Sequence, residues 1–236
     1  MFDDTYSAAL LATHDITKSF GTVKALAGVS LTIASGESVA IMGPSGSGKS
    51  TLLHCLSGVL TPDNGPVLFA GEDLTRMSDA QRSHLRLHQF GFVFQDGQLI
   101  PELPARENVA LPLLLTGTRR RTALAKADEV LAKIGIPDLA DRRPSDMSGG
   151  QAQRVAIARA LAANPRVVFA DEPSGALDQA TGHEVMQLLT ATAAQAGASL
   201  VMVTHDPAVA RWCSRLVEIR DGLVHADRRL DVEVTR

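Results

Sequence analysis

A glycine-rich segment with a single lysine, Gly43 to Thr51, has the residue types needed to hold a phosphate chain. Its sequence, GPSGSGKST, fits the pattern G-x-x-x-x-G-K-[ST]. In this pattern backbone N–H groups surround the phosphates, the lysine reaches the terminal ones and the next hydroxyl ligates Mg²⁺. We predict that Lys49 binds nucleotide and acts in catalysis, and that Ser50 ligates the metal. The other predicted phosphate-binding residues are Gly43, Pro44, Ser45, Gly46, Ser47, Gly48 and Thr51.

A second stretch with phosphate-binding chemistry is MSGGQ, Met147 to Gln151, which opens the helical pattern from Ala152 to Ala162. A helix N-terminus offers unpaired N–H groups and a positive dipole end, and glycines let the backbone approach an anion closely. Alone, the stretch would be read as a serine-capped helix after a glycine turn. Beside a phosphate-binding loop it predicts a second anion site, formed by Ser148, Gly149, Gly150 and Gln151.

Two adjacent carboxylates, Asp171 and Glu172, end an apolar stretch that begins at Arg166. A buried parallel strand that delivers acidic residues to a ligand has this pattern. Neighbouring strand residues point to opposite faces, so the two carboxylates are expected to differ in role. One can hold Mg²⁺, usually through water, and the other can orient or deprotonate an attacking water. An isolated pair would be a solvated strand end, but the preceding motifs favour catalysis.

Two further apolar strands end in polar side chains. Ser199 to Val203 is followed by Thr204 and His205, and Phe90 to Phe94 is followed by Gln95. A neutral imidazole can hydrogen-bond a terminal phosphate or the attacking water, and an amide can coordinate Mg²⁺ and water. We therefore predict catalytic roles for His205 and Gln95, with Gln95 also a metal ligand. The six other histidines show no metal-ligand spacing.

The elements expected to position these residues follow from apolar periodicity. A strand at Glu37 to Met42 feeds the glycine-rich loop, and a helix from Leu52 to Leu60 follows it. Residues 96 to 146 are patterned as helices. Shorter signals are β-strands at 31–33 and 67–70, a capping box at 78–81, a hairpin turn at 221–222 and a frayed tail at 227–236.

Composition limits the function classes. The 236 residues carry a net charge of −3 and the sequence pI is near 6.2, which argues against nucleic-acid binding. There is no apolar run of about 18 residues and no secretory signal, so we expect the chain neither to span nor to enter a membrane unaided. Cys55 and Cys213 lack motif spacing and are interpreted as reduced packing residues.

Together these motifs resemble the ATP-binding subunits of ABC transporters, from about Leu10 to Val224. In that family's terms the glycine-rich loop is similar to Walker A, VVFADE to Walker B, and MSGGQ to the ABC signature. Gln95 is similar to the Q-loop glutamine and His205 to the switch histidine. Ser174 to Asp178 resembles the D-loop, which adds Asp178 to the nucleotide-binding residues.

The resemblance implies an α/β P-loop NTPase fold, with a RecA-like, mixed but mostly parallel sheet, an antiparallel β subdomain and an α-helical subdomain. It implies one ABC ATPase domain over residues 1–236. Residues 8–95 and 147–226 would form the β subdomain and core, and residues 96–146 the helical subdomain. It also implies a head-to-tail homodimer, in which each ATP lies between one subunit's Lys49 and the other's Ser148 and Gly150. Glu172 would be the general base, and Asp171 would support Mg²⁺.

Three positions depart from the commonest family pattern. Met147 replaces leucine, a swap of similar volume that should cost little. Phe20 stands where a tyrosine commonly stacks on adenine; its ring can stack equally, although a core phenylalanine is the alternative. Ala176 replaces an asparagine found in related exporters, which puts one hydrogen bond across the dimer interface in question.

The segment from Gln95 to Gly117 resembles the LolD, MacB and FtsE subgroup of the family. This implies a peripheral ATPase on the cytoplasmic face of the membrane, partnered by an integral membrane permease of FtsX or MacB type. Transport of lipoproteins, peptides or hydrophobic drugs and transmembrane signalling without transport both remain open. A soluble ABC ATPase is a third alternative, but paired modules, zinc-binding cysteines and basic extensions are missing from the sequence. Arg119 to Arg121 is interpreted as a solvated helix start, with anionic lipid headgroups as the alternative.

Overall fold

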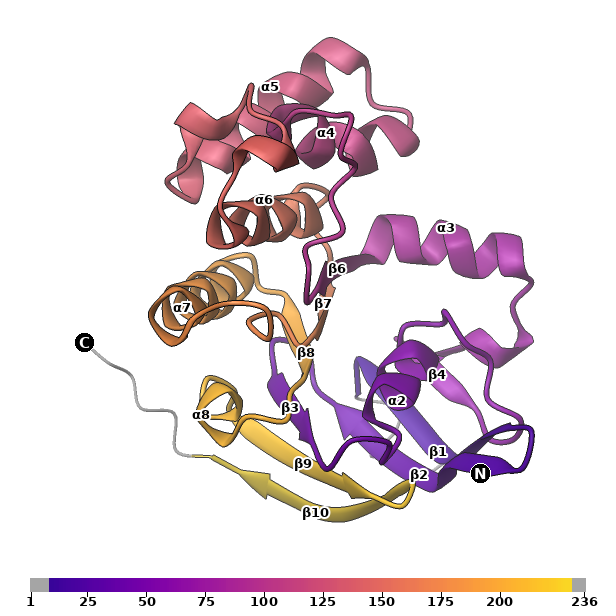
Figure 1. Ribbon diagram of the computed structural model, residues 1–236. Coiled ribbons are helices and arrows are strands. Elements are labelled where there is room, and N and C mark those ends of the chain that lie inside the picture. The colour runs from indigo at the N-terminus through magenta and orange to yellow at the C-terminus, as the bar shows by residue number, and fades with distance from the viewer. Residues whose placement is uncertain (1–8, 231–236) are drawn as a thin grey trace. The chain divides into compact units, whose positions relative to one another are not determined.

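The computed structural model describes residues 9–230, which form two compact units: 9–86 with 199–230, and 87–198 (Figure 1). Each unit is described by itself. Helix α3 (Asp79–Gln89) contains the point in the chain where the first unit passes into the second. The Ser78 and Gln81 side chains each bond the other residue's backbone N–H, so the predicted capping box at the start of α3 is confirmed.

The first unit contains an antiparallel sheet with the strand order β2-β1-β4-β5. Its strands are β1 (Leu11–Phe20), β2 (Val23–Ile33), β4 (Val67–Phe69) and β5 (Glu72–Asp73), and the 3-10 helix η1 (Leu74–Arg76) follows them. Apolar side chains along β1 and β2 are buried, among them Leu11, Ile16, Leu26 and Ile33. The predicted antiparallel β region is therefore present.

Strands β10-β9-β3-β8 stand in that order in the same unit. They are β3 (Ser38–Met42), β8 (Ser199–Val203), β9 (Arg215–Arg220) and β10 (Leu223–Arg229). β3 pairs in parallel with both β8 and β9, and Val39, Ala40 and Ile41 are fully buried as a result. β9 and β10 form a hairpin through Asp221 and Gly222, both with positive φ, which confirms the predicted turn. The helices of this unit are α2 (Lys49–Leu56) and α8 (Pro207–Ala210).

The second unit pairs β6 (Phe90–Phe94) in parallel with β7 (Val167–Asp171). The Phe169 ring contacts the rings of Phe90 and Phe92 at centroid distances of 5.1 and 5.7 Å. The helices are α4 (Ala105–Leu115), α5 (Arg120–Lys133), α6 (Gly149–Leu161) and α7 (Gln179–Gln195), with 3-10 turns η2 (Pro137–Leu139) and η3 (Pro144–Asp146). One apolar core joins α4, α5 and α6, and it includes Ala127, Leu131 and Ile134.

Several predicted boundaries are wrong by a few residues. The helix after the glycine-rich loop spans 49–56 rather than 52–60, because Gly58 has φ +64 and ends it. The signature helix begins at Gly149 rather than Ala152, since Ser148 itself is the cap. β10 reaches Arg229, so residues 227–229 are strand-paired rather than frayed, and residues 231–236 lie outside the described ones. The division at 96–146 remains a prediction.

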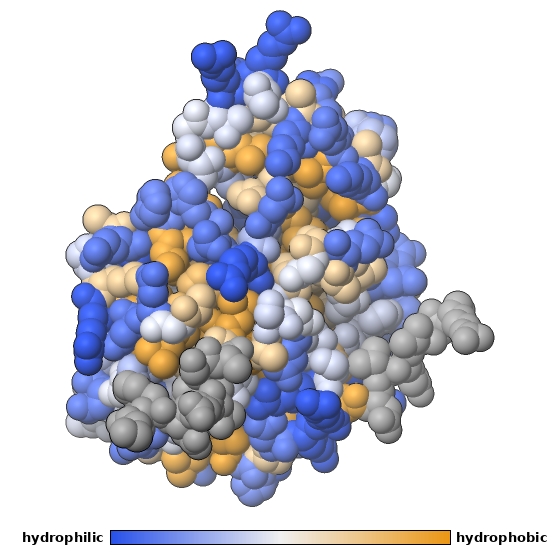
Figure 2. Space-filling model, turned by 180° about the vertical axis from the view of Figure 1, so that it is seen from behind, coloured by the Kyte–Doolittle hydropathy of each residue, from blue (hydrophilic) through white to orange (hydrophobic). Residues whose placement is uncertain are grey.

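Within residues 9–230, no helix is both long and apolar enough to cross a membrane. Hydrophobic residues on the face seen in Figure 2 are interspersed among hydrophilic ones. Cys55 and Cys213 are both buried and free of disulfides, as their interpretation as packing residues predicted.

Candidate functional site

The predicted phosphate-binding loop connects β3 to α2, and its conformation depends on Gly48. This residue caps α2 with φ +102 and has no side chain to fill the cap. A Cβ built on it would lie 2.2 Å from the backbone oxygen of Ala25. Only glycine fits such a left-handed, crowded position. The first N–H groups of α2 are therefore presented to a ligand without a competing side-chain cap.

The polar groups inside the loop are arranged for an anion. Lys49 is 8% exposed, and its Nζ donates to the Pro44 carbonyl at 2.8 Å. Within the described residues the buried Ser47 hydroxyl has no hydrogen-bond partner. Buried polar groups nearly always have partners, and an ammonium is costly to bury without strong acceptors. Phosphate oxygens would satisfy both, so the loop fits a nucleotide. Ser50, the predicted metal ligand, follows Lys49 and is exposed.

His205 lies at the same strand end as this loop. Val203 pairs with Ile41, and the Thr204 N–H donates to the Ile41 carbonyl at 3.1 Å. His205 follows and is exposed, while Gly43 begins the loop after β3. Adjacent parallel strands thus bring the predicted switch histidine and the loop to one edge.

Phe20 ends β1 and is 50% exposed, with the Lys18 ammonium 5.8 Å from its ring centroid. A core phenylalanine would be buried, so that alternative is wrong. An exposed ring face is what stacking on a base requires.

In the second unit, Gln95, Asp171 and Glu172 form a separate group. Phe94 pairs with Asp171, so Gln95 leaves β6 beside the end of β7. A carbon built on Gly175 would lie 3.0 Å from Gln95 Nε2 and 3.2 Å from Glu172 Oε2. The amide and the carboxylate therefore face the same small space.

Glu172 lies outside the strand, and this corrects the predicted reason for its separate role. β7 ends at Asp171, and Glu172 adopts the left-handed conformation with φ +47. The two carboxylates differ because the backbone turns between them, not because strand residues alternate. A left-handed residue other than glycine is strained and is often found at active sites.

The signature residues form a capped helix start. The Ser148 Oγ accepts the Gln151 N–H at 3.2 Å, and the Gln151 side chain accepts the Ser148 N–H at 3.0 Å. A hydroxyl that accepts still has its hydrogen to donate. Asp178 caps α7 in a similar way, and hydrogen bonds from the Thr181 hydroxyl and from the Thr181 and Ala180 amides lower its pKa. Both predicted contact points are exposed helix starts.

Three polar side chains near this site belong to no sequence motif and were not predicted from the sequence. Gln153 and Arg159 on α6 donate to backbone carbonyls around Gln95, and Asn108 on α4 bonds the segment that follows. One signal was available, since Asn108 is a polar residue directly before the apolar run Val109 to Leu115. The bonding partners of the other two are set by the tertiary structure.

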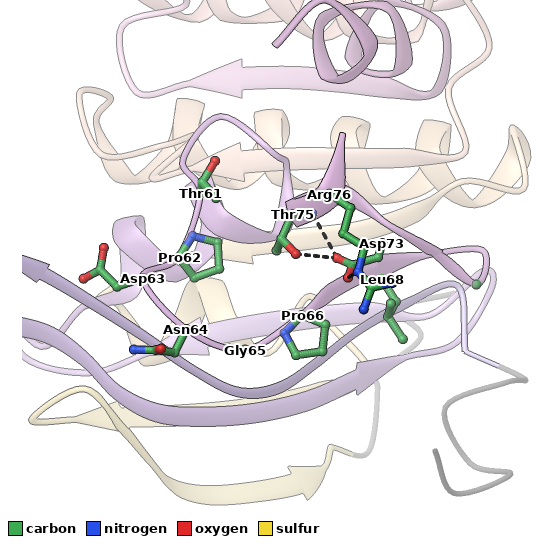
Figure 3. A pocket seen from close by; sticks show the side chains of 11 residues that line it. Thr61, Pro62, Asp63, Asn64, Gly65, Pro66, Leu68, Asp73, Thr75 and Arg76 are labelled. Atoms are coloured by element: carbon green, nitrogen blue, oxygen red, sulfur yellow. Dashed lines mark hydrogen bonds and ion pairs between the residues drawn. The ribbon is translucent and has the colours of Figure 1, made fainter. Parts of the chain in front are cut away.

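A pocket of about 610 Å³ in the first unit, shown in Figure 3, contains none of the predicted site residues. Its lining comes from residues 61–76. The Asp73 carboxylate there accepts the Thr75 N–H at 2.9 Å and pairs with Arg76 at 3.2 Å. The Asp73 carboxylate is thus satisfied by its neighbours in the sequence, in contrast to the Ser47 hydroxyl in the glycine-rich loop.

The chain matches a known protein family and curated relatives. The model of the ABC transporter family matches residues 26–175. The chain is 44% identical to the lipoprotein-releasing system ATP-binding protein LolD of Geobacter metallireducens, covering 93% of this chain and all of that protein. It is 46% identical to the macrolide export ATP-binding/permease protein MacB 1 of Aeromonas hydrophila, but there it spans only 34% of the relative.

Solved structures agree as well. A dimeric post-hydrolysis state of the ATP-binding cassette MJ0796, bound to ADP and Pi, superposes with a TM-score of 0.85 at 40% identity, over 94% of this chain and 99% of that one. The cbiO1 protein of Clostridium perfringens, part of the ABC transporter complex cbiONQ, superposes equally well at 29% identity, over 94% and 89% of the two chains. The predicted α/β P-loop NTPase fold is confirmed. The chain belongs to the ABC transporter family, as an ATP-binding and ATP-hydrolysing subunit of LolD/MacB type.

Proposed function

We propose that the chain powers a separately encoded membrane permease by closing a head-to-tail homodimer around ATP. The proposal rests on the difference between the N-terminal starts of two helices, α2 and α6. The α2 start has a glycine cap, a buried lysine and an unsatisfied hydroxyl, whereas the α6 start is exposed and already capped. A second subunit would supply the α6 start to the ATP held by the first. The MJ0796 cassette, which is dimeric, supports the pairing of two such chains.

Nucleotide binding is assigned residue by residue. The loop N–H groups and Lys49 hold the phosphates, and Phe20 stacks on the base. The partner subunit contributes its own copies of Ser148, Gly149, Gly150, Gln151 and Asp178. The Ser148 hydroxyl hydrogen, left over by the capping box, is the group suited to a phosphate oxygen.

Mg²⁺ is the metal this donor set fits. Within residues 9–230 no cluster of three or more His, Cys, Asp or Glu side chains suits a metal ion. Mg²⁺ is commonly held by one or two protein ligands together with water and substrate phosphates. We assign the Ser50 hydroxyl, the Gln95 amide oxygen and Asp171 as those ligands. When bound, the metal would neutralise charge that develops on the phosphoryl oxygens.

Hydrolysis is assigned to Glu172 as the general base, which takes a proton from the attacking water. The space bounded by Glu172 Oε2 and Gln95 Nε2 lets a carboxylate accept from a water while an amide orients it. Lys49 and His205 stabilise charge on the terminal phosphate.

The relatives support a proposal for the cellular setting. LolD is a lipoprotein-releasing ATP-binding protein, and MacB joins an ATP-binding part and a permease in one chain. We infer a peripheral position on the cytoplasmic face of the membrane and an export-type cargo: a lipoprotein, peptide or hydrophobic drug. Signalling across the membrane without transport, as in FtsE, remains the alternative.

The test is Glu172→Gln. Loss of the base should lower ATP turnover by a factor of about 10² to 10⁴ while nucleotide binding persists. The variant should therefore accumulate as an ATP-bound dimer in size-exclusion chromatography. Glu129→Gln, at an exposed position on α5, is the control and should keep wild-type turnover. Wild-type turnover by Glu172→Gln, or a monomer at saturating ATP, would overturn the proposal.

A further inference from the structure

The segment after β6, residues 95–104, is fastened to α6 by two long polar side chains. We call it the Gln95 segment. Gln153 Nε2 donates to the Phe94 carbonyl at 2.8 Å, just before the segment begins. Arg159 bonds two neighbouring carbonyls within the segment, with Nη2 donating to Gly97 and Nη1 to Gln98, both at 2.7 Å. These bonds join residues about sixty positions apart in the sequence, so the attachment is tertiary rather than local.

Buried Asn108 fastens the far end of the same segment to α4. Its Oδ1 accepts the Ile100 N–H at 2.8 Å, and its Nδ2 donates to the carbonyls of Ile100 and Leu103 at 3.1 and 2.8 Å. Asn108 is fully buried and Gln153 is 2% exposed. Removing a buried partner leaves backbone groups unsatisfied, which makes both attachments costly to break.

Backbone packing reinforces the attachment to α6. A Cβ built on Gly91 of β6 would lie 2.4 Å from the Ala160 carbonyl oxygen, so strand and helix are in direct backbone contact. Arg159 is partly buried while it bonds the two carbonyls, and this burial lowers the pKa of its guanidinium. β6, the Gln95 segment and α6 therefore form one tightly joined piece.

The same helix ends in the signature. α6 is continuous from Gly149 to Leu161, and Ser148 caps its start. A displacement of the Gln95 segment would pull on α6 at Gln153 and Arg159, and a stiff helix passes that displacement to its first turn. The capping box does not depend on the segment, so the start would move as a unit.

We propose that Gln153 and Arg159 are positioning residues that couple Gln95 to the Ser148 end of α6. Occupancy of the terminal phosphate at Gln95 then sets the position of the signature that the other subunit's nucleotide meets. The coupling rests on the proposed function, because it presumes that Gln95 contacts ATP and that Ser148 completes a dimer.

The test is a double-mutant cycle on ATP-driven dimerisation of the full chain carrying Glu172→Gln. Arg159→Met removes the two carbonyl bonds and should weaken dimerisation about tenfold. If Arg159 acts through Gln95, the same change should add little in a Gln95→Ala background. Additive losses would overturn the proposal. Arg154→Met is the matched control, since Arg154 lies on α6 but pairs with Glu184 of α7; it should change the dimer affinity by less than about twofold.

Hydrogen exchange of the monomer gives a second readout that needs no dimer. In Arg159→Met, amides at 97–100 and at 149–152 should both exchange faster than in the parent, and in Arg154→Met those at 97–100 should not. Unchanged exchange at 97–100 in Arg159→Met overturns the inference. If the parent fails to dimerise with ATP, the sandwich function fails, and this exchange result still decides the attachment. Gln153→Met, which removes one neutral bond, replaces Arg159→Met in both assays if the latter does not fold.

Discussion

The N-termini of α2 and α6 both have residue types suited to phosphate, but their caps and the hydrogen bonding of their polar groups differ. At α2 the cap is Gly48 in a left-handed conformation, the lysine is buried, and the Ser47 hydroxyl has no partner among the described residues. At α6 the cap is Ser148, whose hydroxyl and backbone N–H are both bonded to Gln151. The first start is polar and unsatisfied, whereas the second is satisfied before any ligand arrives.

Under the proposed function, this difference gives the two predicted phosphate-binding elements of one chain separate tasks. An unsatisfied, preformed loop gains the most from a ligand, which favours tight binding by a single subunit. A self-capped start has only a spare hydroxyl hydrogen and a few N–H groups to offer, which favours weak contact. Such contact matters when the phosphate is already held elsewhere. A nucleotide site shared between two subunits needs this difference: one helix start that binds tightly and another that adds a weak contact.

The largest expected contrast comes from replacing one glycine at each start. Gly48→Ala forces a left-handed alanine against the Ala25 carbonyl, so we expect a loss of about 3 kcal/mol in the free energy of unfolding. Gly149→Ala has ordinary helical φ, and its Cβ would meet only the Leu177 side chain at 3.2 Å. Stability should stay within about 1 kcal/mol, while ATPase activity falls because the methyl blocks the partner's phosphate. Thermal and urea unfolding together with turnover measure both.

Equal destabilisation by the two substitutions would show that the two helix starts do not differ in backbone strain. Full activity of Gly149→Ala would show that nothing approaches the α6 start closely. Gly197→Ala is a useful reference, because Gly197 has φ +66 and open space around it, so its cost isolates the backbone strain from the steric clash.

Next in size is Lys49→Ala, which removes the buried charge at the α2 start. We expect ATP affinity to fall about 100-fold, since a charge-assisted bond is lost. Calorimetry or a fluorescent nucleotide measures it. Lys133→Ala, at an exposed position of α5, should bind ATP normally. Retained affinity in Lys49→Ala would mean that the α2 start does not hold the nucleotide, and the proposed difference in task between the α2 and α6 starts would be lost.

A smaller effect is expected at Phe20, which is assigned, like the α2 start, to nucleotide binding by a single subunit. Phe20→Ala should weaken ATP binding about tenfold by removing the stacking surface, and Phe20→Tyr should restore it. Inorganic triphosphate binding should not change, because it has no base to stack. If Phe20→Ala weakened triphosphate and ATP equally, Phe20 would be acting through the loop conformation instead.

Features of the fold and of the candidate site could be predicted from the sequence where a contiguous stretch of residues indicates them. The loop, the strands that end before Gln95 and His205, and the signature are contiguous patterns, and the structure places them as expected. The start of α6 was misplaced because two glycines discourage a helix, yet the capping box at Ser148 and tertiary packing stabilise it. Helix propensity is a weak guide against such contacts.

The remaining features depended on contacts distant in sequence. The turn of the backbone at Glu172 has no composition signal, since left-handed glutamate is rare. The bonds of Gln153 and Arg159 reach carbonyls rather than side chains, so residue types alone do not reveal them. Asn108 offered only the hint of a polar residue beside an apolar run.

At neutral pH the smallest effect is expected at Cys55, a buried residue of α2 whose contribution appears only at high pH. Burial raises its pKa to about 12, from an ordinary value of 9.0. The unfolded chain then releases this proton at lower pH than the folded one, so stability should fall as pH rises from about 9 to 12. Cys55→Ala should reduce that slope in urea unfolding, and alkylation at pH 8 should be at least about tenfold slower than in unfolded chain. Rapid alkylation would mean that α2 opens in the folded protein and exposes the Cys55 thiol.

Ser148 is proposed to complete the nucleotide site of another subunit, and Ser148→Arg tests this role. The arginine removes the cap hydroxyl and fills the space a phosphate would occupy. We predict ATP binding by the monomer within about twofold of wild type, and loss of both dimerisation and hydrolysis by at least about 100-fold. Thr122→Arg, at an exposed position of α5, controls for added charge. Undiminished ATPase activity in Ser148→Arg would contradict the shared site.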